Sequence, residues 1–254
     1  MLLTAVVVPG PPALVVELMG SAAHELDDLR RATDEVVSLA LSDLSKASAD
    51  PQSDSDSGTD PVQLVVVVPG EPGEFDASGP VSFAGFGRDV VVPALLVGRR
   101  DDAGLPTPIM VARYLASRDL AAHPEHADLW ASARWVTTRG ADAAALGDRL
   151  RAQGGRVSLI LVADGATCHG PKAPRAEDAR AQGYDDETCE ALASGQPGRL
   201  AQIDQGLGDT LGATGPRVWP VLVAAAGADM IGEVVWAGAP YGVGWAVASW
   251  RRSS

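Results

Sequence analysis

Residues 164–174 hold the densest group of reactive side chains in this 254-residue chain. The segment reads DGATCHGPKAP, so a carboxyl, a hydroxyl, a thiol, an imidazole and an ammonium group follow one another closely. A histidine titrates near neutral pH, and a carboxylate beside it can fix its tautomer. We therefore predict that His169 carries a proton and that Asp164 orients its ring.

A purely structural role for these side chains stays open as an alternative. Asp164 can cap a turn, and His169 can hydrogen-bond a neighbouring carbonyl group. The spacing of Cys168 and Cys189 matches no standard zinc site. Two cysteines are also too few for a disulfide framework, so we predict two free thiols in a reducing compartment.

Two further clusters contain residue types that ligate metals. Residues 123–126 read HPEH, and the proline between the histidines predicts a loop or a helix start, with Asp119 and Asp128 nearby. Residues 71–74 read EPGE and could present paired carboxylates. Acidic loops are ordinary in so acidic a chain, so we assign no metal ligands to either cluster.

Four short apolar runs predict buried strands, because they are rich in β-branched residues and do not alternate with polar ones. They are residues 2–8, 63–68, 157–163 and 218–224. Between these runs, apolar residues at a spacing of three to four predict helices with one buried face. The predicted helices are residues 21–44, 106–118, 141–153, 185–193 and 199–211.

Strands that alternate with helices predict an α/β fold, with a central, mostly parallel sheet covered by helices on both faces. The closing segment, residues 233–250, is expected to form a hairpin at the edge of that sheet. No repeat or domain boundary is evident, so residues 1–254 are predicted to form one domain. Residues 45–60 are rich in Ser, Asp and Gly without an apolar anchor, which predicts a mobile acidic loop.

Ligands of open parallel sheets bind beyond the carboxyl ends of the strands. That rule selects three loops, residues 9–12, 69–75 and 164–174, and predicts a cleft between them. Besides Asp164 and His169, the residues expected to contact a ligand there are Gly10, Pro11, Gly70, Glu71 and Lys172. The sequence has no P-loop, no G-x-G-x-x-G and no G-x-S-x-G motif.

The charge balance restricts the partners of the protein. Acidic residues outnumber basic ones by 33 to 20, which gives a formal net charge of −13. Such a surface repels phosphates and anionic lipids, so we expect neither nucleic acid nor membrane as a partner. The N-terminal apolar run ends at Pro9 with no basic segment before it, unlike a signal peptide. We predict a cytoplasmic protein that binds a small molecule and is compatible with a homo-oligomer.

At its strand ends the sequence resembles the LigB-type branch of the class III extradiol ring-cleavage dioxygenases. The resemblance rests on four segments in the family's order, and they extend over almost the whole chain. They are AVVVPGPP at residues 5–12, the strand Leu64–Val68 with Pro69-Gly70, VADG at 162–165, and APYGVG at 239–244 followed by Trp250.

This resemblance implies an α/β fold around a central sheet. Active members of the family hold non-haem Fe(II) with two histidines and a glutamate, and use another histidine as acid–base catalyst. Iron in such a site keeps open positions where a catechol and O₂ bind side by side.

Carried over to this chain, the resemblance leaves the iron site without its two histidine ligands. Gly10 stands where the first ligand histidine is expected, and Pro69-Gly70 stands where the second is expected. Glycine has no side-chain donor, and the loss of two of three ligands should abolish a specific Fe(II) site. His169 matches the acid–base histidine, with Asp164 close by.

Three hypotheses follow, and whether the protein is an enzyme depends on which one holds. The favoured one is a metal-free relative that binds a small molecule or a partner in the strand-end cleft, with no cofactor. The second is an active Fe(II) dioxygenase of catechol-like substrates that takes ligands elsewhere, such as His123 or His126. The third is a metal-independent hydrolase or isomerase that works through Asp164 and His169.

Overall fold

The computed structural model describes residues 1–49, 61–96 and 104–253. A seven-stranded sheet runs through them in the order β3-β6-β2-β7-β1-β9-β8. Its strands are β1 (Leu2–Val8), β2 (Val62–Pro69), β3 (Gly73–Phe75), β6 (Arg134–Thr138), β7 (Arg156–Val162), β8 (Met230–Gly238) and β9 (Trp245–Arg252). A separate two-stranded sheet pairs β4 (Val81–Ser82) with β5 (Val91–Val92).

The four central strands β6, β2, β7 and β1 are parallel, which confirms the predicted mixed α/β class and mostly parallel sheet. Strand β3 pairs antiparallel with β6, and β9 pairs antiparallel with β1. Strand β8 follows at the other edge, antiparallel to β9. The carboxyl ends of the four parallel strands therefore lie at one edge of the sheet, together with the β8–β9 turn.

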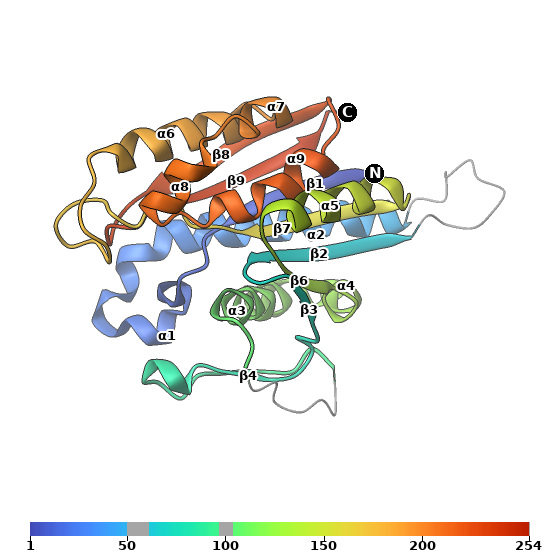
Figure 1. The fold of residues 1–254 in the computed structure, drawn as a ribbon. Coiled ribbons are helices and arrows are strands. Elements are labelled where there is room, and N and C mark those ends of the chain that lie inside the picture. The colour runs from blue at the N-terminus through green and yellow to red at the C-terminus, as the bar shows by residue number, and fades with distance from the viewer. Residues whose placement is uncertain (50–60, 97–103, 254) are drawn as a thin grey trace.

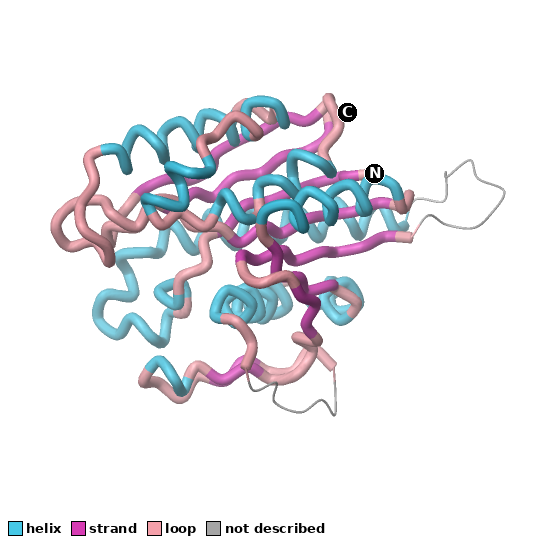
Figure 2. The backbone as a smooth tube through the Cα atoms, in the orientation of Figure 1, coloured by secondary structure: helices cyan, strands magenta, loops and turns pink. Residues whose placement is uncertain are grey.

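Strand β2 is apolar along its length because it lies inside the sheet and is covered on both faces. Leu64, Val66 and Val68 face one hydrophobic core, and Val65 and Val67 face the other. Figures 1 and 2 show helices around the sheet on both sides, with α5 and α9 in front and α2 behind. Valine suits this position, since a branched side chain packs well on a pleated, buried surface.

The long helices divide between the two cores. Helices α2 (Asp27–Ala49) and α3 (Thr107–Ala122) pack against one face of the sheet. Helices α5 (Gly140–Ala152), α6 (Arg180–Ala193) and α9 (Trp219–Ala225) pack against the other. The shorter helices are α1 (Val16–Met19), α4 (Ala127–Ala131), α7 (Pro197–Leu200) and α8 (Gln205–Leu211). Within the described residues, no helix has the length and apolar character needed to cross a bilayer.

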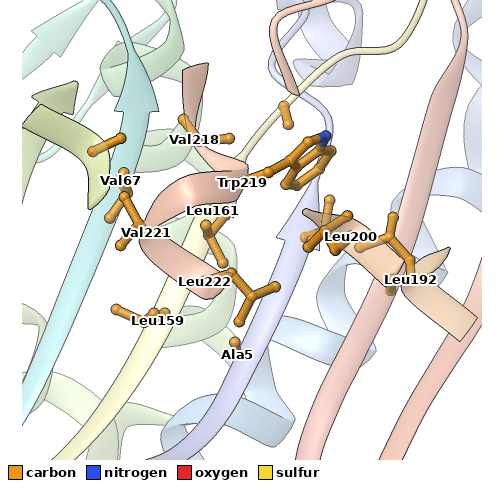
Figure 3. Packing of buried hydrophobic residues seen from close by; sticks show 14 of the residues in the cluster. Ala5, Val67, Leu159, Leu161, Leu192, Leu200, Val218, Trp219, Val221 and Leu222 are labelled. Atoms are coloured by element: carbon orange, nitrogen blue, oxygen red, sulfur yellow. The ribbon is translucent and has the colours of Figure 1, made fainter. Parts of the chain in front are cut away.

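The prediction of a strand at residues 218–224 is wrong, because this segment forms helix α9. Figure 3 shows its side chains Val221 and Leu222 lying against Leu159 and Leu161 of the sheet. Helices α5 and α9 approach closely at Gly147, where an added Cβ would lie 2.7 Å from the Cβ of Ala224. An apolar run covered by a sheet and a second helix looks the same in sequence as a buried strand.

Two further predictions need correction, and one strand was not predicted. Strand β6, with the sequence RWVTT, was not predicted because arginine and threonine interrupt its apolar pattern. The helix predicted at residues 199–211 is divided into α7 and α8, because Asp204 caps the start of α8 by accepting the Leu207 N–H at 2.9 Å. Of the loop predicted at residues 45–60, residues 45–49 belong to α2 and residues 50–60 lie outside the described residues.

Candidate functional site

A cavity of about 160 Å³ lies beyond the carboxyl end of β7. Five parts of the chain line it: strand β1 at Val7, the segment after β7, one side of α6, the start of α9 and both ends of the β8–β9 turn. The lining residues are Val7, Ala163, Asp164, Gly165, His169, Gln182, Asp185, Asp186, Cys189, Trp219, Ala237, Gly238, Ala239, Gly244, Trp245 and Ala246. The predicted residues Asp164 and His169 therefore share one cavity.

The ring of His169 is held by a carboxylate from helix α6. His169 Nε2 lies 2.6 Å from Asp185 Oδ2, and both side chains are largely buried, with 11% and 15% of their surfaces exposed. Asp185 Oδ1 also accepts the backbone N–H of Ala166 at 3.0 Å. Burial raises the pKa of Asp185, while the bonds from Ala166 and His169 act in the opposite direction.

Two glycines leave the space that the Asp185 carboxyl group occupies. A Cβ added at Gly165 would lie 2.5 Å from Asp185 Oδ1, and one added at Gly244 would overlap Asp185 Oδ2. The backbone also joins these two positions, since Gly165 N–H donates to the Gly244 carbonyl at 2.7 Å and Gly244 N–H donates to the Ala166 carbonyl at 2.7 Å. Backbone hydrogen bonds thus hold the β8–β9 turn against the segment after β7, and the Asp185 carboxyl group packs against a glycine of each.

Asp164 occupies a different environment in the same cavity. Its Oδ1 accepts the backbone N–H of Gly10 at 3.1 Å, and its own N–H donates to Thr214 Oγ1 at 2.8 Å. Among the described residues, Oδ2 of Asp164 accepts no hydrogen bond. Burial raises the pKa of Asp164 to about 6, and the Gly10 N–H only partly offsets this. Near neutral pH, both forms of this carboxyl group are accessible.

The prediction that Asp164 orients His169 is wrong, because Asp185 bonds the ring and Asp164 turns toward Gly10. No local pattern joins His169 to Asp185, since helix α6 brings the aspartate in from 16 residues further along the chain. A sequence signal was nevertheless present, because adjacent acidic residues open the predicted helix at 185–193.

The other predicted contacts do not meet in a single cleft. Gly10 lies beside Asp164, and an added Cβ there would lie 2.7 Å from Val162 Cγ1. Gly70 and Glu71 instead line a separate polar hollow of about 540 Å³. Neither Pro11 nor Lys172 lines the cavity at β7, and Lys172 is exposed.

Sequence reasoning missed the apolar and thiol parts of the cavity wall. Trp219 and Trp245 come from α9 and β9 and are both more than nine-tenths buried. Cys189 also lines the cavity, but burial raises the pKa of its thiol to about 11, so the nucleophilic thiolate is scarce near neutral pH. Both cysteines are free, as predicted.

The residues present do not fit an Fe(II) centre. Positions 10 and 70 are glycines without a donor atom, and the described residues contain no group of three His, Cys, Asp or Glu side chains placed to hold a metal ion. His126 is buried and its Nδ1 lies 2.9 Å from Asp119 Oδ2. It belongs to the segment that leads through α4 into the amino end of β6, away from the carboxyl ends of the strands.

Comparison with known proteins adds little to this description. No known family profile matches the sequence, and no curated protein is similar to it. Among solved structures, the fold is similar to the crystal structure of uncharacterized protein JW3007 from Escherichia coli K12. The two chains are 11% identical, with a TM-score of 0.42 over 98% of this chain and 99% of the other. A likeness at this level supports no conclusion about activity.

Proposed function

We propose that the protein binds a small organic molecule in the cavity at the end of β7 and transfers a proton to or from it without a metal ion. One observation carries this proposal: a histidine–aspartate hydrogen bond and a carboxyl group with a pKa of about 6 line the same cavity. Titratable groups held in different environments within one cavity are typical of acid–base sites.

The size of the cavity sets the size of the ligand. Its volume of about 160 Å³ is close to that of an engineered apolar cavity of ~150 Å³ that binds benzene. Trp219, Trp245 and several small residues supply an apolar wall for such a molecule. A ligand with a single ring therefore suits the space, and a nucleotide or a peptide does not.

His169 is the proton carrier in this proposal. Its Nε2 is bonded to Asp185, which leaves Nδ1 to exchange a proton with the ligand. Asp185 fixes the tautomer and the orientation of the ring, and it is itself held by the Ala166 N–H. This arrangement of an oriented base in a cavity is suited to general acid–base catalysis.

Asp164 is the second acid–base group. With a pKa near 6, it can donate or accept a proton at neutral pH, unlike an exposed aspartate that is fully ionised there. Its Oδ1 is fixed by the Gly10 N–H, and its Oδ2 is left without a bond from the described residues. Two groups with separate positions could thus serve as the acid and the base of one reaction.

The proposed relation to the extradiol dioxygenases is that of a metal-free relative. Its support is the glycine at position 10, where even a methyl group would come within 2.7 Å of Val162. The same proposal assigns the protein to the cytoplasm, supported by two free cysteines, which are typical of a reducing compartment.

The test is catalysis in D₂O. The protein is incubated with a panel of single-ring carbonyl compounds and esters, and proton NMR records both deuterium uptake and hydrolysis. We expect conversion of at least one compound, with a loss of at least ~100-fold in His169→Ala. His123→Ala, at a partly exposed histidine outside the cavity, is the matched control and should retain full activity.

Two results would contradict the proposal. Equal conversion by His169→Ala and the unaltered protein would remove the histidine from the reaction. Stoichiometric iron in protein purified without oxygen, together with ring cleavage of a catechol, would favour the dioxygenase hypothesis instead.

A further inference from the structure

The cavity at β7 has a pronounced charge imbalance. Asp164, Asp185 and Asp186 contribute carboxyl groups to its lining, and His169 is the one basic residue among the lining residues. Within the described part of the chain, none of these three carboxylates pairs with a lysine or an arginine. Elsewhere the protein pairs such groups, for example Asp34 with Arg118 and Glu74 with Arg134. The lining therefore holds more carboxyl groups than basic groups, and Asp164 and Asp186 have no basic partner among the described residues.

We infer that the ligand of this cavity is a small organic cation, which carries an ammonium group on an apolar body the size of one ring. The inference rests on the proposed function. Asp164 Oδ2 has no hydrogen-bond donor from the described residues and supplies an acceptor for the ammonium group. A charge-assisted hydrogen bond of this kind is about twice as strong as a neutral one.

The aromatic lining favours the same class of ligand. Trp219 and Trp245 lie in the wall formed by α9 and β9. Both indoles are more than nine-tenths buried and supply an apolar surface for the ring of the ligand. The carboxyl groups are left to hold the ammonium group, whereas an anionic ligand would be repelled by Asp164.

A metal ion is the competing cation, and the arrangement of donors argues against it. A divalent ion needs several ligands at short and similar distances. The described residues contain no group of three His, Cys, Asp or Glu side chains placed to provide them. One carboxylate of the three, that of Asp185, is already engaged with His169 and Ala166. An ammonium group needs only one or two acceptors.

Calorimetry with matched probes tests the inference at pH 7.5. Pyrrolidine, which is cationic, is compared with tetrahydrofuran, a neutral ring of the same size. Benzylamine is compared in the same way with benzyl alcohol and with anionic benzoate. We expect each amine to bind at least about tenfold more tightly than its neutral counterpart, and benzoate not to bind.

Three single substitutions show which carboxyl group causes the preference for amines. Asp164→Asn should remove most of the preference for the amines and leave the neutral probes unchanged. Asp186→Asn, at an exposed residue on the rim of the cavity, should reduce the preference for amines about twofold, and only at low salt. Asp142→Asn is the matched control, because Asp142 lines the other hollow beside Arg139.

The outcomes separate the inference from the proposed function. Neutral probes that bind as tightly as the amines would overturn the inference and leave acid–base chemistry in the cavity intact. Loss of the amine preference in Asp142→Asn but not in Asp164→Asn would overturn it as well. If no probe binds and no compound is converted in D₂O, both fail together.

Discussion

Two histidine–aspartate pairs occur among the residues that the structure describes, and they differ in what surrounds them. His126 Nδ1 lies 2.9 Å from Asp119 Oδ2, and both side chains are 2% exposed. Trp130 Nε1 donates to the same oxygen at 2.8 Å, and the ring of His126 stacks on that of His123. The pair His169–Asp185 has a similar bond, but its residues line a cavity. Hydrogen bonding alone therefore does not separate a structural pair from a chemical one, whereas access to a ligand does.

The first prediction removes His169, the histidine of the pair that lines the cavity. We expect His169→Ala to lower turnover by about 10²- to 10⁴-fold, since a positioned acid–base group contributes that much. Its unfolding midpoint in urea should change little, because His169 borders an existing cavity, so its removal enlarges that cavity and does not create a sealed void. A large loss of stability with full turnover would reverse the roles of the two pairs.

The second prediction removes the histidine of the buried pair. His126→Ala should lower the free energy of unfolding by about 2 to 4 kcal/mol, because it leaves a void and removes one of the two hydrogen-bond partners of the buried Asp119 Oδ2, with only Trp130 Nε1 remaining. Activity per folded molecule should stay unchanged. Urea denaturation measures the effect, and His123→Ala, at a side chain 40% exposed, should cost much less.

The third prediction concerns Asp164, whose pKa in the folded protein is about 6, above its value of 3.8 in an unfolded chain. Between these pH values the folded state binds more protons, so the contribution of Asp164 to stability falls as pH rises through this window. Asp164→Asn should therefore raise the free energy of unfolding at pH 7.5 by about 1 to 3 kcal/mol. The same variant should also show a smaller change in the free energy of unfolding between pH 4 and 6 than the unaltered protein.

Denaturation curves at several pH values provide that measurement. A variant that is less stable than the unaltered protein at pH 7.5 would contradict the raised pKa. Higher stability combined with lost turnover is the expected result at a functional site, where activity and stability are often in conflict.

The fourth prediction has the smallest expected effect and concerns the glycines around Asp185. Gly244→Ala places a methyl group on the Asp185 carboxylate, so the carboxylate and the ring of His169 should shift. We expect a loss of turnover of about tenfold, or ~1.4 kcal/mol in activation free energy. Gly183→Ala is the control, because a Cβ there meets no atom within 4 Å and favours helix α6. Equal turnover in the two variants would contradict the role of Asp185 in orienting the ring.

The parts of the fold that the sequence predicted are those governed by local pattern. Strands β1, β2 and β7 are apolar on both faces, so their composition alone identifies them. Helix α9 shares that composition, although it packs on the sheet beside α5 as a helix. Strand β6 was missed because Thr137 and Thr138 are buried there, which sequence patterns count as polar.

The candidate site was predictable only where local pattern identifies its residues. His169 and Asp164 follow a recognisable strand, and the rule of strand ends places them at the ligand-binding edge. Asp185 reaches His169 only through the packing of α6, which no local pattern encodes. Gly70 and Glu71 also lie at a strand end, but the side chains between them and β7 divide the edge into two hollows.

The packing of the β8–β9 turn around Asp185 has a consequence for which substitutions this region can accept together. Gly165 and Gly244 both approach the Asp185 carboxyl group so closely that an added Cβ at either position would meet its oxygens. A larger side chain at either glycine therefore fits without displacing that carboxyl group only if position 185 becomes smaller, so these three positions must change together.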